Sequence, residues 1–214
     1  MLVNRRDVLA AAAAAGVVAV SPLSLVGALA QAAPSTAELM AEGPLKDIWL
    51  GKPDAPVTMI EYASLTCSHC ATFHNQTYPT LKSKYIDTGK VRFVMREFPL
   101  DPLALAGSML ARCAGDDKRN SVVELLFARQ TEWLVDKPVA ALMNVVKQAG
   151  FTQESFESCL KNQELYDAVS KTRDRASEKF GINSTPTFFI NGKKQAGAIT
   201  VDELDKLLAP YLKS

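Results

Sequence analysis

Hydrophobic and polar residues alternate in some segments of the chain and recur at helical spacing in others, which predicts strands and helices respectively. Val57–Ala63 and Val91–Phe98 are short, β-prone runs with loose alternation, and each predicts a strand of a buried sheet. Residues 68–85, between them, have the pattern of a helix. Ile48–Leu50 is a shorter apolar run before a turn, and it predicts one more strand ahead of these elements.

Residues 100–180 show only helical patterns. Asp101 and Pro102 begin the first helix, because Asp caps a helix and Pro suits its first turn. Ser121 and Glu124 fit a capping box, which predicts the start of the next helix there. The remaining helices of this block are expected at residues 137–150, 152–161 and 163–180.

Strand patterns return near the C-terminal end of the chain. Thr187–Ile190 and Lys193–Ala196 are extended runs separated by Asn191-Gly192, and an Asn-Gly pair in this position is a strong hairpin signal. A capping box at Thr200–Glu203 starts a final helix that continues to about residue 212.

The order of these elements predicts an α/β protein with a thioredoxin fold and an all-helical domain inserted between its β-α-β and β-β-α halves. The expected segments are residues 33–98 for the N-terminal half of the thioredoxin domain, 99–180 for the inserted helical domain and 181–214 for the C-terminal half. Residues 1–32 precede them as a signal peptide.

The first 32 residues have the pattern of an export signal. Arg5 and Arg6 precede an Ala-rich apolar run from Val8 to Ala30, and the small residues that end it fit a small-x-small cleavage site. The paired arginines resemble a bacterial twin-arginine signal. An ordinary secretory signal and a retained membrane anchor are the alternatives. All three place the rest of the chain outside the cytoplasm.

Composition and charge narrow the possible functions. Of the 214 residues, 48% are hydrophobic and 22% are charged, and the net charge is +1. This composition is typical of a globular protein, and the balanced charge excludes a nucleic-acid binder that works by bulk positive charge. Four cysteines in an exported chain favour disulfide bonds, whereas the two histidines are too few for a multi-ligand zinc module.

Cys67-Ser68-His69-Cys70 is the candidate redox site. The cysteines follow a predicted strand and open a predicted helix, which is the context of a thioredoxin-like redox pair. Unpaired amides and the helix dipole favour the thiolate of Cys67, so we expect a lowered pKa and an attacking role for it. Cys70 lies one turn later, where it can resolve a mixed disulfide. His69 and Ser68 are expected to stabilise the thiolate further, which makes the disulfide a stronger oxidant.

Other uses of a C-x-x-C pair have different requirements. A c-type haem site needs His directly after the second Cys, where this chain has Ala71. A zinc site needs two more ligands, and His74 is the only near candidate. A purely structural disulfide is the other alternative.

Three stretches of the sequence together resemble the DsbA-like thiol:disulfide oxidoreductases. They are Ala55–Ala63 with Cys67–Cys70, Arg96–Leu100, and Ser184–Gly192. The resemblance extends from about residue 45 to the C-terminus, and the combination of C-x-H-C with Thr-Pro-Thr is specific. It implies the same fold as the order of elements predicts. It also implies that Cys67 and Cys70 are the catalytic pair.

The resemblance also implies roles for residues outside this pair. Pro186 looks like the family's cis-proline, which lies beside the disulfide and offers backbone to a bound substrate, and Thr185 before it tunes redox behaviour. Glu61 is placed as a buried acid that accepts or relays a proton, with an exposed strand-end carboxylate as the alternative. Ser68 and Thr185 stand where the best-known oxidases have Pro and Val, and Thr185 resembles the isomerases.

Cys113 and Cys159 resemble the extra cysteine pair of some alpha-proteobacterial members, which forms a second, structural disulfide. Export favours such pairing. The alternative is two separate buried thiols that pack as small apolar groups.

We therefore expect a monomeric periplasmic enzyme that introduces disulfide bonds into exported proteins. It acts on unfolded or reduced chains, needs no cofactor, metal or nucleic acid, and by resemblance is reoxidised by a membrane partner of the DsbB type. A disulfide isomerase or reductase with the same site is the nearest alternative. An exported chaperone or metal-binding module with a static disulfide is the other.

Overall fold

The computed structural model describes residues 34–212, and the expected export signal lies outside the described residues. Within that range, none of the helices combines the length and the apolar character that a membrane crossing requires.

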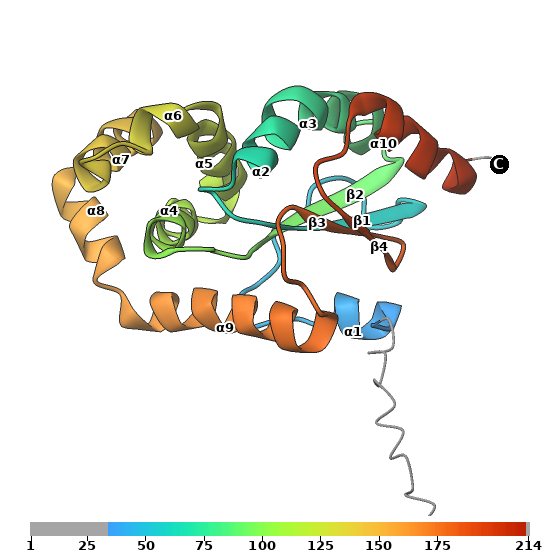
Figure 1. The fold of residues 1–214 in the computed structure, drawn as a ribbon, viewed down its shortest axis with the longest axis horizontal. Coiled ribbons are helices and arrows are strands. Elements are labelled where there is room, and N and C mark those ends of the chain that lie inside the picture. The colour runs from blue at the N-terminus through green and yellow to red at the C-terminus, as the bar shows by residue number, and fades with distance from the viewer. Residues whose placement is uncertain (1–33, 213–214) are drawn as a thin grey trace, which may run out of the picture. The chain divides into compact units, whose positions relative to one another are not determined.

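A four-stranded sheet with the strand order β2-β1-β3-β4 lies at the centre of the described residues (Figure 1). β1 (Val57–Ala63) runs parallel to β2 (Val91–Glu97) and antiparallel to β3 (Thr187–Ile190). β3 forms a hairpin with β4 (Lys193–Ala196) through the predicted Asn191-Gly192 turn. The parallel pair requires a crossover, which the helical run after β1 supplies. This topology confirms the predicted thioredoxin fold.

Helices cover both faces of the sheet (Figure 1). On one face the run after β1 comprises α2 (Ser68–Thr72), α3 (Tyr78–Thr80) and π-helical turns at Phe73–Thr77 and Leu81–Ile86. It lies beside α10 (Val201–Leu208), which a 3-10 turn at Ala209–Tyr211 follows. On the other face, a buried cluster joins Leu39 of α1 (Thr36–Met40) and Phe180 to Ile60 and Phe189 of the sheet.

A block of helices occupies the chain between β2 and β3, as predicted. Its members are α4 (Pro102–Cys113), α5 (Asp116–Ala128), α6 (Gln130–Trp133), α7 (Pro138–Val146) with a 3-10 turn at Lys147–Ala149, α8 (Gln153–Leu160) and α9 (Gln163–Phe180). α9 returns along the sheet beside α1 (Figure 1).

Two local predictions are wrong. Ile48–Leu50 is not a strand, because only Leu50 pairs with the sheet, through an isolated bridge to Phe93. Ser121 does not cap a helix, because it lies inside α5, which begins directly after Gly115. Gly115 has a φ of 87°, which favours glycine, and two acidic residues follow it in the first turn, where the helix dipole favours them.

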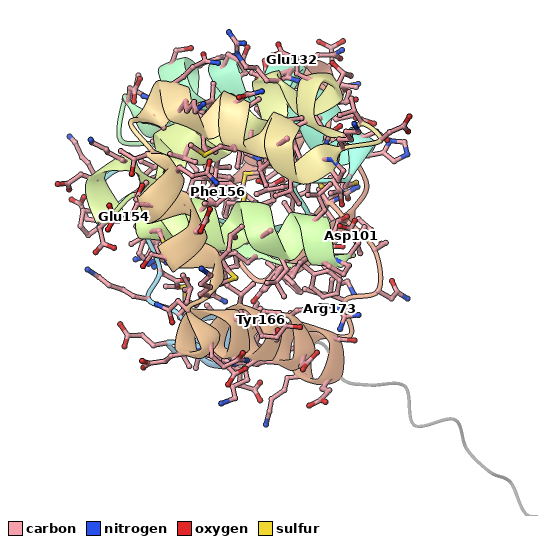
Figure 2. The ribbon with its side chains drawn as sticks, turned by 90° about the vertical axis from the view of Figure 1, so that its left-hand side faces the viewer. Asp101, Glu132, Glu154, Phe156, Tyr166 and Arg173 are labelled. Atoms are coloured by element: carbon pink, nitrogen blue, oxygen red, sulfur yellow. A yellow bond between two sulfur atoms is a disulfide. The ribbon has the colours of Figure 1, made fainter. Side chains whose placement is uncertain are left out.

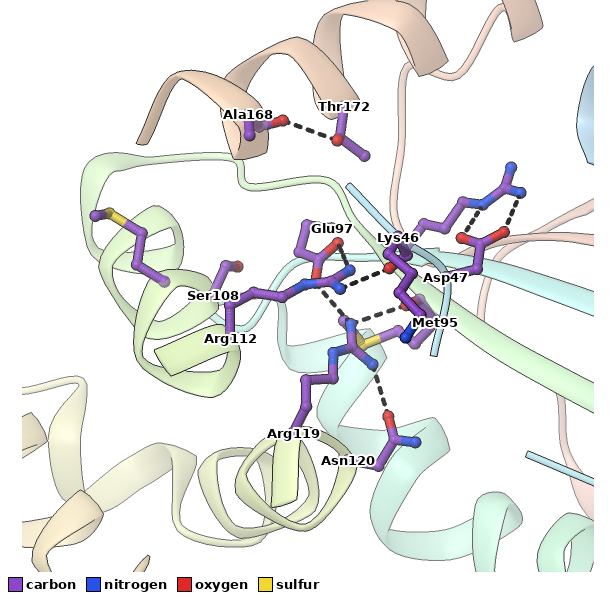
Figure 3. Close-up of polar contacts among 12 residues, drawn as sticks. Lys46, Asp47, Met95, Glu97, Ser108, Arg112, Arg119, Asn120, Ala168 and Thr172 are labelled. Atoms are coloured by element: carbon purple, nitrogen blue, oxygen red, sulfur yellow. Dashed lines mark hydrogen bonds and ion pairs between the residues drawn. The ribbon is translucent and has the colours of Figure 1, made fainter. Parts of the chain in front are cut away.

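A buried ionic cluster joins the sheet to the inserted helices (Figure 3). Glu97, at the end of β2, accepts two hydrogen bonds from Arg112 of α4 at 2.7 and 2.8 Å and one from Arg119 of α5 at 2.8 Å. Burial alone would raise the pKa of Glu97, but the two guanidinium groups lower it to about 2. The carboxylate is therefore ionised, and it balances two buried positive charges.

Candidate active site

Cys67 lies at the junction between β1 and α2. It is the N-cap residue of α2, with extended backbone angles, so its sulfur lies at the positive end of the helix. Cys70 lies inside the first turn and is completely buried, whereas Cys67 is half-buried. Both residues are free thiols, so the structure represents the reduced form of the pair. Cys67 is thus the more accessible of the two thiols and the one that a second protein can reach.

The pKa of the Cys67 thiol is lowered to about 5. The largest cause is a hydrogen bond from the Cys70 thiol, which outweighs the opposing effect of burial. The Thr185 side chain and the backbone amides of Cys70 and His69 lower the pKa further. Cys67 is therefore a thiolate at neutral pH, which is the nucleophilic form.

The pKa of the Cys70 thiol is shifted in the opposite direction. Burial raises it, and the hydrogen bond to Cys67 and the negative charge of Glu61 raise it further. The two sulfurs therefore have distinct chemistry, with a thiolate at the surface and a protonated thiol beneath it.

The loop before β3 completes the surroundings of Cys67. The Cys67 sulfur lies 3.3 Å from the carbonyl oxygen of Thr185, to which its protonated form donates a hydrogen bond, and the Thr185–Pro186 peptide bond is cis. The hydroxyl oxygen of Thr185 is buried and makes no hydrogen bond to any other group among residues 34–212, so the Cys67 sulfur is the group on which it acts. The Thr185 hydroxyl can therefore stabilise a negatively charged Cys67 sulfur. The substrate-binding roles of Thr185 and Pro186 stay predictions.

Ser68 and His69 are both exposed on the first turn of α2. Ser68 accepts a hydrogen bond from the Thr72 hydroxyl at its backbone carbonyl, and His69 acts on Cys67 through its backbone amide. Of the two backbones, only that of His69 acts on Cys67. The redox-tuning roles of the Ser68 and His69 side chains stay predictions.

Glu61 is completely buried, so the alternative of an exposed carboxylate is wrong. Its Oε2 lies 2.9 Å from Nε2 of His74, and the two side chains are 0% and 2% exposed. His74, the near candidate for a zinc ligand, therefore pairs with Glu61 instead. Sequence reasoning missed this contact, although the position of His74 one turn after Cys70 on a helix was a signal for it.

Two polar residues of the helical block hold the loop that carries Cys67. The side-chain amide of Gln130, on α6, donates to the carbonyls of Leu65 and Cys67 at 2.8 and 3.1 Å. Asp101 accepts a hydrogen bond from the Thr66 hydroxyl at 2.5 Å while it caps α4. Sequence reasoning missed both contacts to the loop, and only the cap at Asp101 carried a local signal.

A cavity of about 270 Å³ lies between the start of α4 and α9, and its wall includes Asp101, Tyr166 and Arg173 (Figure 2). Leu100 also lines it, and this side chain and Tyr166 are among the exposed large apolar residues of the described chain. Because Asp101 accepts a hydrogen bond from Thr66, the residue before Cys67, this partly apolar surface lies beside the loop that carries the reactive thiol.

Cys113 and Cys159 are joined by a disulfide bond that links the end of α4 to α8. Cys113 is exposed and Cys159 is buried. The bond closes a loop that spans 46 positions, all within the helical block.

Comparisons with known sequences agree with this geometry. Residues 44–209 match a family model described as thioredoxin. A Rickettsia bellii protein named "Putative protein-disulfide oxidoreductase" is 34% identical over 148 residues, which cover 68% of this chain and 57% of that protein. The chain thus spans just over half of the length of this relative.

Two solved structures are similar over most of the chain. Alpha-DsbA1 from Wolbachia pipientis is 31% identical and matches with a TM-score of 0.75 over 83% of this chain and 96% of that chain. Oxidised BdbD from Bacillus subtilis is 26% identical and matches with a TM-score of 0.62 over 78% of this chain and 94% of that chain.

Proposed function

The chain belongs to the DsbA-like proteins of the thioredoxin family, and from that premise we propose that it is a thiol:disulfide oxidoreductase that introduces disulfide bonds into exported proteins. The observation that carries the proposal is the contrast between the two thiols. Cys67 has a pKa of about 5 at a helix start, whereas the pKa of buried Cys70 is raised. A stabilised thiolate favours the reduced form of the pair, so the oxidised form is a strong oxidant.

The reaction is a pair of thiol–disulfide exchanges. A substrate thiolate attacks Cys67 of the Cys67–Cys70 disulfide, a new S–S bond forms, and Cys70 leaves as a thiolate that takes up a proton. A second substrate thiolate then attacks the substrate sulfur of the mixed disulfide, and Cys67 leaves as a thiolate. The substrate loses two electrons and the enzyme gains two. The low pKa of Cys67 makes it a good leaving group in this second step.

The surroundings of Cys67 suit an unfolded polypeptide as substrate. We propose that the substrate lies against the backbone at Thr185 and Pro186, whose loop contacts the Cys67 sulfur. The exposed side chains of Leu100 and Tyr166 offer apolar contacts nearby, which an unfolded chain can use.

Location, partners and domain division are part of the same proposal. The paired arginines and apolar run in residues 1–32 support export to the periplasm. A membrane partner of the DsbB type reoxidises the protein, which works as a monomer without a bound cofactor. We assign residues 99–180 to an inserted domain, because only helices lie between β2 and β3.

Oxidation of reduced, unfolded ribonuclease A tests the proposal. We expect the oxidised wild-type protein to form disulfides in this substrate stoichiometrically, and Cys67→Ser and Cys70→Ser variants to form none. A double variant that retains full exchange activity would instead indicate a binding module with a static disulfide. Faster repair of scrambled ribonuclease than oxidation of the reduced form would favour an isomerase.

A further inference from the structure

Glu61 and His74 form a buried pair whose role the exchange reaction alone does not define. Their hydrogen bond joins Oε2 of Glu61 to Nε2 of His74, and both side chains are almost completely buried. The remaining atoms, Oε1 of Glu61 and Nδ1 of His74, are buried too, and neither has a hydrogen-bond partner among the described residues. An unsatisfied buried polar atom is costly, so two in one pair require a reason.

The two unsatisfied atoms lie at opposite ends of the hydrogen-bonded pair, one on Glu61 and one on His74. On the Glu61 side lies Cys70, whose sulfur is close enough for the charge of Glu61 to act on its pKa. On the His74 side lies a cavity of about 380 Å³, and His74 is part of its wall. Lys82 and Asp87 also line this cavity, and their side chains are 44% and 53% exposed, so water can enter it.

We propose that His74 forms a proton relay with Glu61, which carries the Cys70 proton between the buried sulfur and the water of this cavity. The inference rests on the proposed function, because it needs Cys70 to lose and regain a proton in each cycle. His74 does not touch the reacting sulfurs and acts through Glu61.

Protons balance in this relay, because Glu61 gains one while His74 loses one and the net charge of the pair stays the same. When Cys70 attacks a mixed disulfide, its proton passes to Oε1 of the Glu61 carboxylate. The imidazolium of His74 then releases the proton on Nδ1 to water, while its Nε2–H continues to donate to Oε2. One proton thus moves from sulfur to solvent, and the Cys70 thiolate supplies the electron pair for the new S–S bond. The reverse sequence protonates Cys70 when it is the leaving group.

The groups around His74 are suited to this role. Phe127 of α5 stacks on the imidazole at a centroid distance of 4.2 Å, which holds the ring in place. Tyr78 of α3 lies 5.0 Å from it on another side and donates its hydroxyl to Glu124 of α5. Burial raises the pKa of Tyr78, so this hydroxyl keeps its proton at neutral pH.

Few charged groups other than Glu61 lie around the imidazole within residues 34–212. Glu124, Lys82 and Asp87 line the cavity, and Arg119 of α5 acts on Tyr78. The turn that carries His74 contacts the α10 region through an uncharged hydrogen bond from Thr77 to the carbonyl of Ile199.

His74→Gln is the informative variant. The Gln amide can donate to Glu61 as the imidazole does, but it cannot release a proton. Dithiol protein is mixed rapidly with excess oxidised glutathione at pH 5 to 9 and quenched with acid. Mass spectrometry then counts the Cys67–glutathione mixed disulfide, whose decay reports the attack by Cys70. Glu124→Gln is the matched control, because it removes a charge from the same cavity without touching the pair.

We expect the decay in His74→Gln to be about 10- to 100-fold slower at pH 7, at or below the low end of what positioned proton transfer contributes, because Glu61 is retained. Its rate rises more steeply with pH than that of wild type, because Glu61 can no longer pass the proton on through His74 and solvent base must remove it. The pH profile of Cys67 alkylation stays unchanged, and Glu124→Gln stays within twofold of wild type. A His74→Gln rate within twofold of wild type across the pH range overturns the relay alone. A wild-type protein that forms no mixed disulfide overturns the proposed function, and the relay with it.

Discussion

Replacement of Glu97 by Gln tests how the inserted helices are fixed to the sheet. Gln keeps the size of the side chain, but it removes the negative charge that balances Arg112 and Arg119. The side chains of these arginines are 10% and 1% exposed, so neither can turn fully to water. Loss of one partner from a buried ionic cluster leaves unpaired charge and costs about 3–5 kcal/mol.

The pKa of Glu97 gives a second value for the same interaction. A pKa lowered from 4.5 to about 2 corresponds to about 3 kcal/mol of stabilisation at neutral pH. The folded-state pKa is the lower one, so this stabilisation is present above about pH 4.5 and is lost as the pH falls towards 2. The difference in unfolding free energy between wild type and Glu97→Gln therefore becomes smaller as the pH falls from about 4.5 to 2.

Urea unfolding of the oxidised proteins between pH 2 and pH 7 measures both effects. Asp116→Asn is the control, because its ion pair with Lys46 is exposed, so the loss of this pair and of one charge at the start of α5 should cost less than about 1 kcal/mol. If Glu97→Gln lowers the unfolding free energy by less than about 1 kcal/mol at pH 7, the Glu97 cluster does not stabilise the fold as argued. A difference that stays constant down to pH 2 contradicts this stabilisation equally, because wild-type Glu97 would then not be the titrating group.

Three further predictions concern the site and its support. Alkylation of the reduced protein by iodoacetamide follows the Cys67 thiolate, so its rate reaches half of its plateau near pH 5, and a midpoint above 8 contradicts the stabilised thiolate. Gln130→Ala removes the hydrogen bond to the carbonyl of Cys67, and we expect a higher Cys67 pKa in the same alkylation assay. An unchanged pH profile of alkylation means that Gln130 supports the fold only. Replacement of Cys113 and Cys159 by Ala removes the closure of a loop spanning 46 positions and is expected to cost about 4 kcal/mol in the chain-entropy model, measured by urea unfolding with the Cys67 pair reduced.

The sequence predicted those features whose causes are local. The caps at Asp101 and Thr200 lie where the sequence places them, because each hydrogen bond joins residues three positions apart. The hairpin at Asn191-Gly192 is local in the same way. The start of α5 was mispredicted because two local signals compete there, and Gly115 prevails over the capping box at Ser121.

Features that depend on tertiary contacts could not be predicted in this way. Gln130 is separated from Leu65 by 65 positions, and nothing in its neighbourhood indicates that its amide holds the loop before Cys67. Glu97 resembles an ordinary charge at the end of a strand until two arginines from later helices surround it. His74 has a local signal in its spacing from Cys70, but its partner Glu61 is on the neighbouring strand.

The central claim is that the Cys67–Cys70 pair is a strong oxidant, and equilibrium titration against glutathione tests it most directly. The lowered pKa of Cys67 predicts a reduction potential well above that of thioredoxin, towards about −120 mV, the value for DsbA. A potential near about −270 mV, the value for thioredoxin, would contradict the claim and indicate a reductase.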